Sequence, residues 1–314
     1  MTAAAPTVPS TSTGTLVEKE RSVSDRRRKS YSSEKQRSNL LTVILWLCAL
    51  YFVFPLLWLL IASTKNNEDL FTSFGFFFGK TFSLFQNIGD VFSASGGIYW
   101  HWALNTVLYA GASAVGASLL ATMSGYAFAK YEFPGGKALF SITLGAIMIP
   151  LTALAIPTYL LFSSAGLTNT PWAVILPSLV SPFGVFLMRV YAADAVPDSL
   201  IEAARVDGAG EFRIFWQVSL RLLGPGVVTV FLFALVGTWN NYFLPLIMLS
   251  TQELYPLTVG LAQQQSASAA GGGAQALFST VITGSLVSVI PLVIAFLFLQ
   301  RYWQTGLATG GVKG

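Results

Sequence analysis

Long apolar runs separated by short polar segments make up most of the chain, a pattern typical of a membrane protein. A helix that crosses a bilayer needs about 20 consecutive, mostly apolar residues. Six stretches are long and apolar enough, namely residues 41–63, 102–128, 138–163, 172 to beyond 189, 222–249 and 276–299. The fourth contains Pro177 and Pro182, which interrupt a helix. The pattern therefore predicts an all-α membrane protein with six transmembrane helices.

Lys and Arg are distributed unevenly between the polar segments. If the N-terminus lies inside, the outer segments hold only Lys65 and Lys80, and the other sixteen of the 18 cations are on the inner side. Positive residues collect on the cytoplasmic side of membrane proteins. We therefore expect a multi-pass protein of the cell membrane with a transmembrane domain over residues 39–300. Both termini should be cytoplasmic, and residues 301–314 should form a C-terminal tail.

Composition agrees with this class and argues against several kinds of site. Charged residues are 10% of the chain, against about 25% in soluble domains. The single cysteine, Cys48, rules out an internal disulfide framework, and no group of His, Cys, Asp and Glu has metal-site spacing. We expect no metal and no cofactor on this chain.

Residues 1–38 are rich in Ser and Thr and then basic, which predicts a disordered cytoplasmic tail. A patch that binds anionic lipid is the alternative interpretation.

The segment "PDSLIEAARVDGAGEFR", residues 197–213, interrupts the apolar pattern between the fourth and fifth predicted spans. Ser199 and Glu202 have the spacing of a capping box and predict the start of a short helix. Gly208 suits the position just after that helix, where a left-handed conformation is common. A second helix is expected from Glu211 to about residue 222.

Large aromatic residues in this aqueous segment argue against a plain solvated loop, which is the alternative interpretation. Phe212, Phe215 and Trp216 follow one another closely. Exposed aromatic clusters mark contact surfaces. We expect these side chains to be covered by the base of the membrane domain or by a partner protein.

At this point the sequence "EAARVDGAGEF…VSLRLLGP" resembles the EAA loop of ABC-importer permease subunits. The residues that match its core are Glu202, Ala203, Ala204, Asp207, Gly208 and Ala209. Val218, Leu220, Leu222 and Pro225 match the tail of the motif, which extends the loop over residues 197–222. Arg221 stands where the family usually has proline, so the bend there is expected to be softer or displaced.

Other segments resemble the carbohydrate branch of this family, in particular the maltose-type smaller permease. They are "TWNNYFLPLIML" (238–249), "YPLTVGLA" (255–262) and the C-terminal "LQRYWQTGLATGGVKG". The resemblance implies a type I ABC-importer permease fold in which the EAA loop is a coupling helix. It also implies import of a sugar or oligosaccharide by alternating access, and a C-terminal tail that threads as an extended strand between partner subunits.

The resemblance implies several partners as well. They are a second homologous permease subunit, a dimer of ATPase subunits on the cytoplasmic side, and an extracytoplasmic solute-binding protein. The chain lacks the G-x-x-x-x-G-K-[ST] phosphate-binding motif, so we do not expect it to be an enzyme. ATP and Mg would be bound by the partner ATPase subunits, and no nucleic acid is expected.

A polar group lies inside the fifth predicted span, at Trp239, Asn240, Asn241 and Tyr242. Amides at membrane depth cost free energy unless they are hydrogen-bonded. On a helix the two amides would occupy neighbouring faces, so at least one should face the helix bundle or a wet cavity. Amides next to aromatic rings suit a sugar in the substrate path, whereas hydrogen bonding between helices is the other interpretation.

The rival function is an ion-coupled secondary carrier or a channel subunit. Such proteins usually need an ionisable residue at membrane depth, and none of the six predicted spans provides one apart from the boundary residue Arg189. A membrane scaffold without transport is a further alternative, but it leaves the polar group in the fifth span unexplained.

Overall fold

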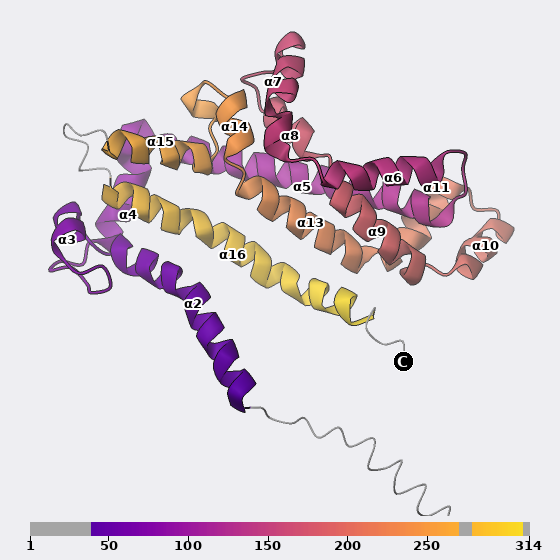
Figure 1. Ribbon diagram of the computed structural model, residues 1–314, viewed down its shortest axis with the longest axis horizontal. Coiled ribbons are helices and arrows are strands. Elements are labelled where there is room, and N and C mark those ends of the chain that lie inside the picture. The colour runs from indigo at the N-terminus through magenta and orange to yellow at the C-terminus, as the bar shows by residue number, and fades with distance from the viewer. Residues whose placement is uncertain (1–38, 270–277, 310–314) are drawn as a thin grey trace, which may run out of the picture. The chain divides into compact units, whose positions relative to one another are not determined.

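The computed structural model describes residues 39–269 and 278–309, and within these ranges the chain is helical without β-strands (Figure 1). This confirms the predicted all-α class. Four helices are long and apolar enough to cross a membrane, and two bent helix pairs bring the number to six if each pair is one span. The predicted disordered tail, residues 1–38, lies outside the described residues.

The α-helices, in chain order, are α2 (Asn39–Ser63), α3 (Asn67–Thr72), α4 (Leu84–Ser93), α5 (Ile98–Lys130), α6 (Gly136–Ile147), α7 (Ala155–Ser164), α8 (Trp172–Ser178), α9 (Pro182–Ala195), α10 (Asp198–Val206), α11 (Glu211–Ile214), α12 (Leu220–Leu222), α13 (Gly224–Trp239), α14 (Phe243–Met248), α15 (Leu257–Ala269) and α16 (Phe278–Thr309). A π-helical turn, Phe215–Ser219, joins α11 to α12.

The third and fifth predicted spans are interrupted, because their helices break. The third predicted span is divided into α6 and α7, which meet at 100°. Pro150 lies in that break, and a proline cannot donate the hydrogen bond that would continue the helix. The fifth is divided as well, because α13 ends at Trp239 and α14 begins at Phe243.

The chain forms two compact units, Met1–Leu56 and Leu57–Gly314. In the first, the described residues are the apolar N-terminal part of α2, and all their side chains are exposed. A helix that is hydrophobic all round needs lipid or another helix around it. In the second unit, the backbone of α16 remains helical to Thr309. The expected extended tail is therefore helical over residues 306–309, and residues 310–314 lie outside the described residues.

Helix α5 is the centre of the second unit, and α9 and α13 pack along it. Small residues allow these helices to approach closely. Four alanines of α5 are almost completely buried, namely Ala110, Ala114, Ala117 and Ala121. A β-carbon at Gly125 would lie 2.7 Å from the backbone nitrogen of Arg189 in α9, so only glycine fits there.

Helix α5 has 33 residues, and at 1.5 Å per residue it is about 50 Å long. Figure 1 shows α10 and α11 near one end of α5 and α4 and α15 near the other. Helix α10 and helix α15 therefore lie near opposite ends of the same long helix.

Candidate functional site

The first candidate region is helix α10, which begins two residues earlier than the capping box requires. Pro197 has extended backbone angles and occupies the N-cap position, and no side chain caps the helix. Ser199 is therefore the second helical residue and Glu202 the fifth, so the predicted capping box is wrong. Asp198 occupies the first turn, where a negative charge interacts favourably with the helix dipole.

The end of α10 confirms the predicted glycine position. Gly208 has φ +79° and lies just past the C-cap residue Asp207. Its N–H donates to the carbonyl of Arg205, and the N–H of Ala209 donates to the carbonyl of Ala204, both at 3.0 Å. These two hydrogen bonds form a Schellman motif, in which a left-handed residue reverses the chain.

The coupling residues implied by the EAA resemblance divide into exposed and half-buried sets. Glu202, Ala203, Asp207 and Gly208 are exposed, and Val206, which the sequence motif does not include, is 87% exposed. The half-buried residues are Ala204 and Ala209, which pack against a core cluster that contains Ile201, Tyr126 and Phe215. One face of α10 thus contacts the rest of the chain, and the other is open to a partner.

The aromatic residues after Gly208 are only partly covered. Phe215 is buried, and its ring centroid lies 5.2 Å from that of Tyr126. Phe212 remains 72% exposed, and its ring lies 5.9 Å from that of the exposed Trp216. The expectation that the membrane-domain base covers these side chains is therefore met for Phe215. The other two extend the exposed surface next to α10.

The link from α11 to α13 contains a π-helical turn and a sharp bend. The Ser219 hydroxyl lies in the π-turn and donates to the Tyr126 hydroxyl at 3.1 Å. The bend between residues 211–222 and α13 is 81°. It falls just after Arg221, at Leu223, and α13 then begins with Gly224 and Pro225. The bend lies two residues after Arg221.

A charged group joins α10 to α11. Arg205 donates from Nε to Glu211 Oε1 at 2.7 Å and from Nη2 to Oε2 at 3.2 Å. Tyr131, just past the end of α5, donates to the same Oε2 at 2.6 Å. The hydrogen bonds from Arg205 and then Tyr131 lower the pKa of the Glu211 carboxyl below its usual value. Glu211 is therefore ionised at neutral pH and accepts all three bonds.

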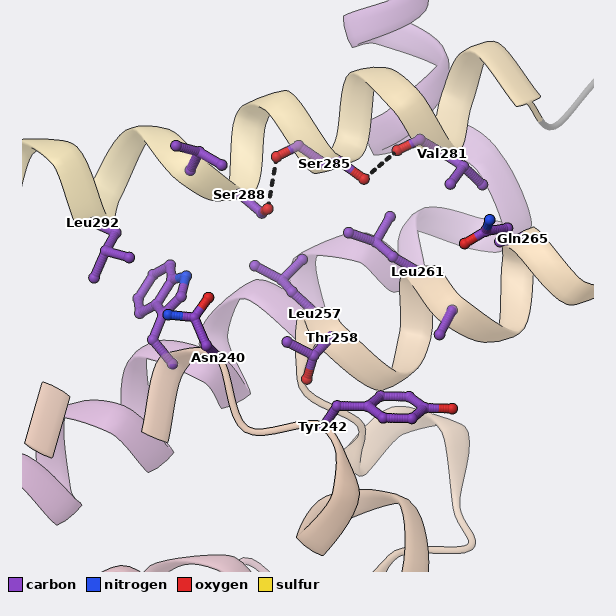
Figure 2. A pocket seen from close by; sticks show the side chains of 13 residues that line it. Asn240, Tyr242, Leu257, Thr258, Leu261, Gln265, Val281, Ser285, Ser288 and Leu292 are labelled. Atoms are coloured by element: carbon purple, nitrogen blue, oxygen red, sulfur yellow. Dashed lines mark hydrogen bonds between the residues drawn. The ribbon is translucent and has the colours of Figure 1, made fainter. Parts of the chain in front are cut away.

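The second candidate region is a pocket of about 370 Å³ between the α13–α14 break, α15 and α16 (Figure 2). Its lining residues are Trp239, Asn240, Tyr242, Leu257, Thr258, Leu261, Ala262, Gln265, Val281, Ser285, Ser288, Val289 and Leu292. The lining offers hydroxyl and amide groups, an indole and a phenol. None of these described lining residues carries a charge.

Three of the four predicted substrate-path residues line this pocket, and Asn241 does not. The expectation that the two amides lie on one helix is wrong, because Asn240 and Asn241 are in the break between α13 and α14. Asn240 donates to the carbonyl of Val236 at 2.9 Å. Asn241 instead accepts from the backbone N–H of Leu244 at 3.3 Å and so supports the start of α14.

Sequence reasoning missed the polar residues that α15 and α16 contribute to the pocket. Thr258 donates to the backbone carbonyl of Asn241 at 2.8 Å. Ser285 and Ser288 donate to carbonyls of their own helix at 2.8 Å and 2.7 Å, as Figure 2 shows. Each hydroxyl keeps acceptor capacity. The available signal was the spacing of the two serines, because residues three apart share a helix face.

The family model described as binding-protein-dependent transport system inner membrane component matches residues 117–307. The arabinooligosaccharides transport system permease protein AraQ of Halalkalibacterium halodurans is 35% identical over 276 residues, which are 88% of this chain and 96% of that protein. The lactose transport system permease protein LacG of Rhizobium radiobacter is 30% identical over 273 residues, 86% of this chain and 94% of that protein.

A solved structure gives the same fold. It is described as a bacterial ABC transporter involved in the import of the acidic polysaccharide alginate, and one of its chains matches with a TM-score of 0.73 at 23% identity. The match covers 87% of this chain and 98% of that chain. Because the family model spans more than half of the sequence and the AraQ protein matches almost throughout, the chain belongs to the family of binding-protein-dependent transport system inner membrane components.

Proposed function

We propose that this chain is the permease subunit of an ABC importer that moves a neutral sugar or oligosaccharide into the cell. The observation that carries the substrate class is the uncharged pocket at the α13–α14 break. Relatives named for arabinooligosaccharides and lactose support the same class. An ion-coupled carrier would need an ionisable group there, and the pocket lining has none.

The pocket has the two kinds of contact that a sugar needs. Trp239 and Tyr242 offer ring faces to the apolar face of a pyranose, while Asn240, Thr258 and Ser288 offer hydrogen bonds to its hydroxyls. Non-helical backbone at membrane depth is tolerated where it lines a cavity. The break between α13 and α14 meets this condition, because Asn240 and Tyr242 line the pocket. The second permease subunit would complete the path from its own side.

The exposed face of α10 is the proposed docking surface for the ATPase subunit. Glu202, Ala203, Val206 and Asp207 present a compact mix of charged and small apolar groups. ATP and Mg would be bound by that partner. Closure of the ATPase dimer would then move α10, and a solute-binding protein would act on the opposite side of the membrane. Together these partners would shift the equilibrium of the membrane domain between its two conformations.

Transport in proteoliposomes tests the proposal. The chain would be reconstituted with its second permease and ATPase subunits, and uptake of radiolabelled neutral oligosaccharides would be driven by ATP and the loaded binding protein. Loss of one hydrogen bond is worth about 0.5–1.5 kcal/mol, so Asn240→Ala should lower uptake about 2- to 10-fold. Gln263→Ala is the matched control, because Gln263 is exposed on α15 outside the pocket.

Normal uptake by Asn240→Ala together with Ser288→Ala would contradict the assignment of this pocket to the sugar. Absence of ATP-driven sugar uptake by the wild-type assembly would contradict the proposed function itself.

A further inference from the structure

Both ends of α10 are tied to the end of α5 by polar contacts. Lys130, the last residue of α5, forms an ion pair with Asp198, the first residue of α10, at 2.8 Å. Tyr131, the next residue, donates to Glu211 at 2.6 Å, and Glu211 holds Arg205 near the end of α10. Two consecutive residues of the chain therefore hold a nine-residue helix at its start and its finish.

The first tie joins a nearly buried side chain to an exposed one. The side chain of Lys130 is 5% exposed, whereas that of Asp198 is 78% exposed. A buried ammonium is costly unless a carboxylate or carbonyl accepts from it. Within the described part of the chain, Asp198 is the one carboxylate paired with Lys130. Between the two ties, buried Ile201 fixes α10 to the core cluster at this end of α5.

The opposite end of α5 is hydrogen-bonded to the walls of the pocket. The Tyr99 hydroxyl donates to the carbonyl of Gly284 in α16 at 2.7 Å. Thr106 accepts from the backbone N–H of Leu257, the first residue of α15, at 2.8 Å. Leu257 lines the pocket, and Gly284 precedes the pocket residue Ser285.

Helix α5 also holds the segment that leads into α15. The indole of Trp102 donates to the carbonyl of Gln252 at 2.9 Å, and the Tyr109 hydroxyl donates to that of Leu254, also at 2.9 Å. A movement of this end of α5 must therefore carry the start of α15 with it.

Among the candidate spans that the structure describes, α5 is the one that is both continuous and free of proline. Its 33 residues contain no proline. By contrast, α2 and α16 contain Pro55 and Pro291, and the remaining candidate spans are interrupted between α6 and α7, α8 and α9, and α13 and α14. A continuous helix transmits a displacement along its axis, whereas prolines and breaks are the usual sites of bending.

We propose that α5 is the rod that carries movement of α10 to the pocket walls, and that Lys130 and Tyr131 are the positioning residues that fix α10 to this rod. The inference rests on the proposed function, because α10 must be moved by an ATPase subunit. With both ties intact, α10 and the far end of α5 move as one body. With both broken, α10 still docks but is held to α5 by apolar packing alone, so less of its displacement reaches the pocket.

The double variant Lys130→Met with Tyr131→Phe tests this in the complete importer. Both replacements keep the shape of the side chain and leave Asp198 and Glu211 solvated, so the fold is retained. We expect normal co-purification of the ATPase subunit and retained basal ATP hydrolysis. Sugar uptake per ATP hydrolysed should fall about 5-fold or more, the lower end of typical coupling between sites. Lys137→Met is the matched control, because Lys137 is exposed nearby and forms no ion pair within the described residues.

Charge exchange gives a rescue test. Lys130→Glu sets two carboxylates against each other and should lower sugar uptake per ATP, and adding Asp198→Lys should restore much of the ratio, since the ion pair is re-formed with reversed signs. A structural role unrelated to this pair would not respond to the second change.

Three results would overturn the inference. A double variant that transports as much sugar per ATP as the wild type would overturn this inference alone and leave the proposed function standing. Loss of the ATPase subunit from the double variant would do the same, because the ties would then serve docking and not transmission. A wild-type importer without ATP-driven uptake would overturn the proposed function, and this inference with it.

Discussion

At the scale of single residues, Gly208 has a conformation that other residues adopt at a cost. Its φ of +79° lies in the left-handed region, and it closes the Schellman motif that ends α10. A β-carbon there would meet nothing within 4 Å. The free-energy cost of a side chain therefore comes from the backbone conformation and from a clash with a partner surface, not from packing within this chain. Gly210, two residues later, has φ −71° and equally open surroundings. The two glycines therefore separate backbone strain from side-chain bulk.

Gly208→Val should fold and insert normally but couple poorly, whereas Gly210→Val should be much milder. A side chain in the left-handed region costs about 1–2 kcal/mol, which would displace the end of α10. The measurement is sugar uptake together with co-purification of the ATPase subunit for both variants. If Gly208→Val transports normally with its ATPase subunit fully bound, α10 is not the coupling element.

At the scale of elements, the contact between α15 and α5 depends on a second glycine for a different reason. A β-carbon at Gly260 would overlap the indole of Trp102, whose N–H is fixed by the carbonyl of Gln252. Because α15 forms one wall of the pocket, this contact determines where that wall lies.

Gly260→Ala should therefore destabilise the protein and disturb the pocket. Overpacking a close contact costs about 1–3 kcal/mol. Gly237→Ala in α13 is the control, since a β-carbon there meets nothing within 4 Å, and alanine is the better helix former. Thermal unfolding in detergent would compare the two variants. A Gly260→Ala protein as stable as the wild type would show that the indole can move aside.

At the scale of the whole molecule, the Lys and Arg asymmetry predicts that α10 is cytoplasmic and that the segment around Lys80 is external. Both Val206 and Lys80 are exposed, so a cysteine at either position is accessible to a label. With Cys48 first replaced by serine, a membrane-impermeant maleimide should label Lys80→Cys in intact cells. It should label Val206→Cys only after permeabilisation. Labelling of Val206→Cys from outside would reverse the topology and rule out an ATPase partner at α10.

The sequence by itself determined the features that depend on local chemistry. Apolar runs long enough to cross a bilayer predicted the helices, and the glycine after "EAARVD" marked the end of α10 because a left-handed residue is needed there. The EAA pattern indicated the family, which the family model and the AraQ match confirm.

Only the tertiary structure decided which polar groups meet. The N-cap of α10 is Pro197 and not Ser199, a shift of two residues that removes the expected capping box and that composition does not determine. The break after Trp239 directed Asn240 into the pocket and Asn241 to the start of α14, although the two are adjacent and identical. Likewise, Lys130 meets Asp198 across 68 positions of the chain. Such pairings follow from how α5 packs against its neighbours, and no local pattern of residues encodes them.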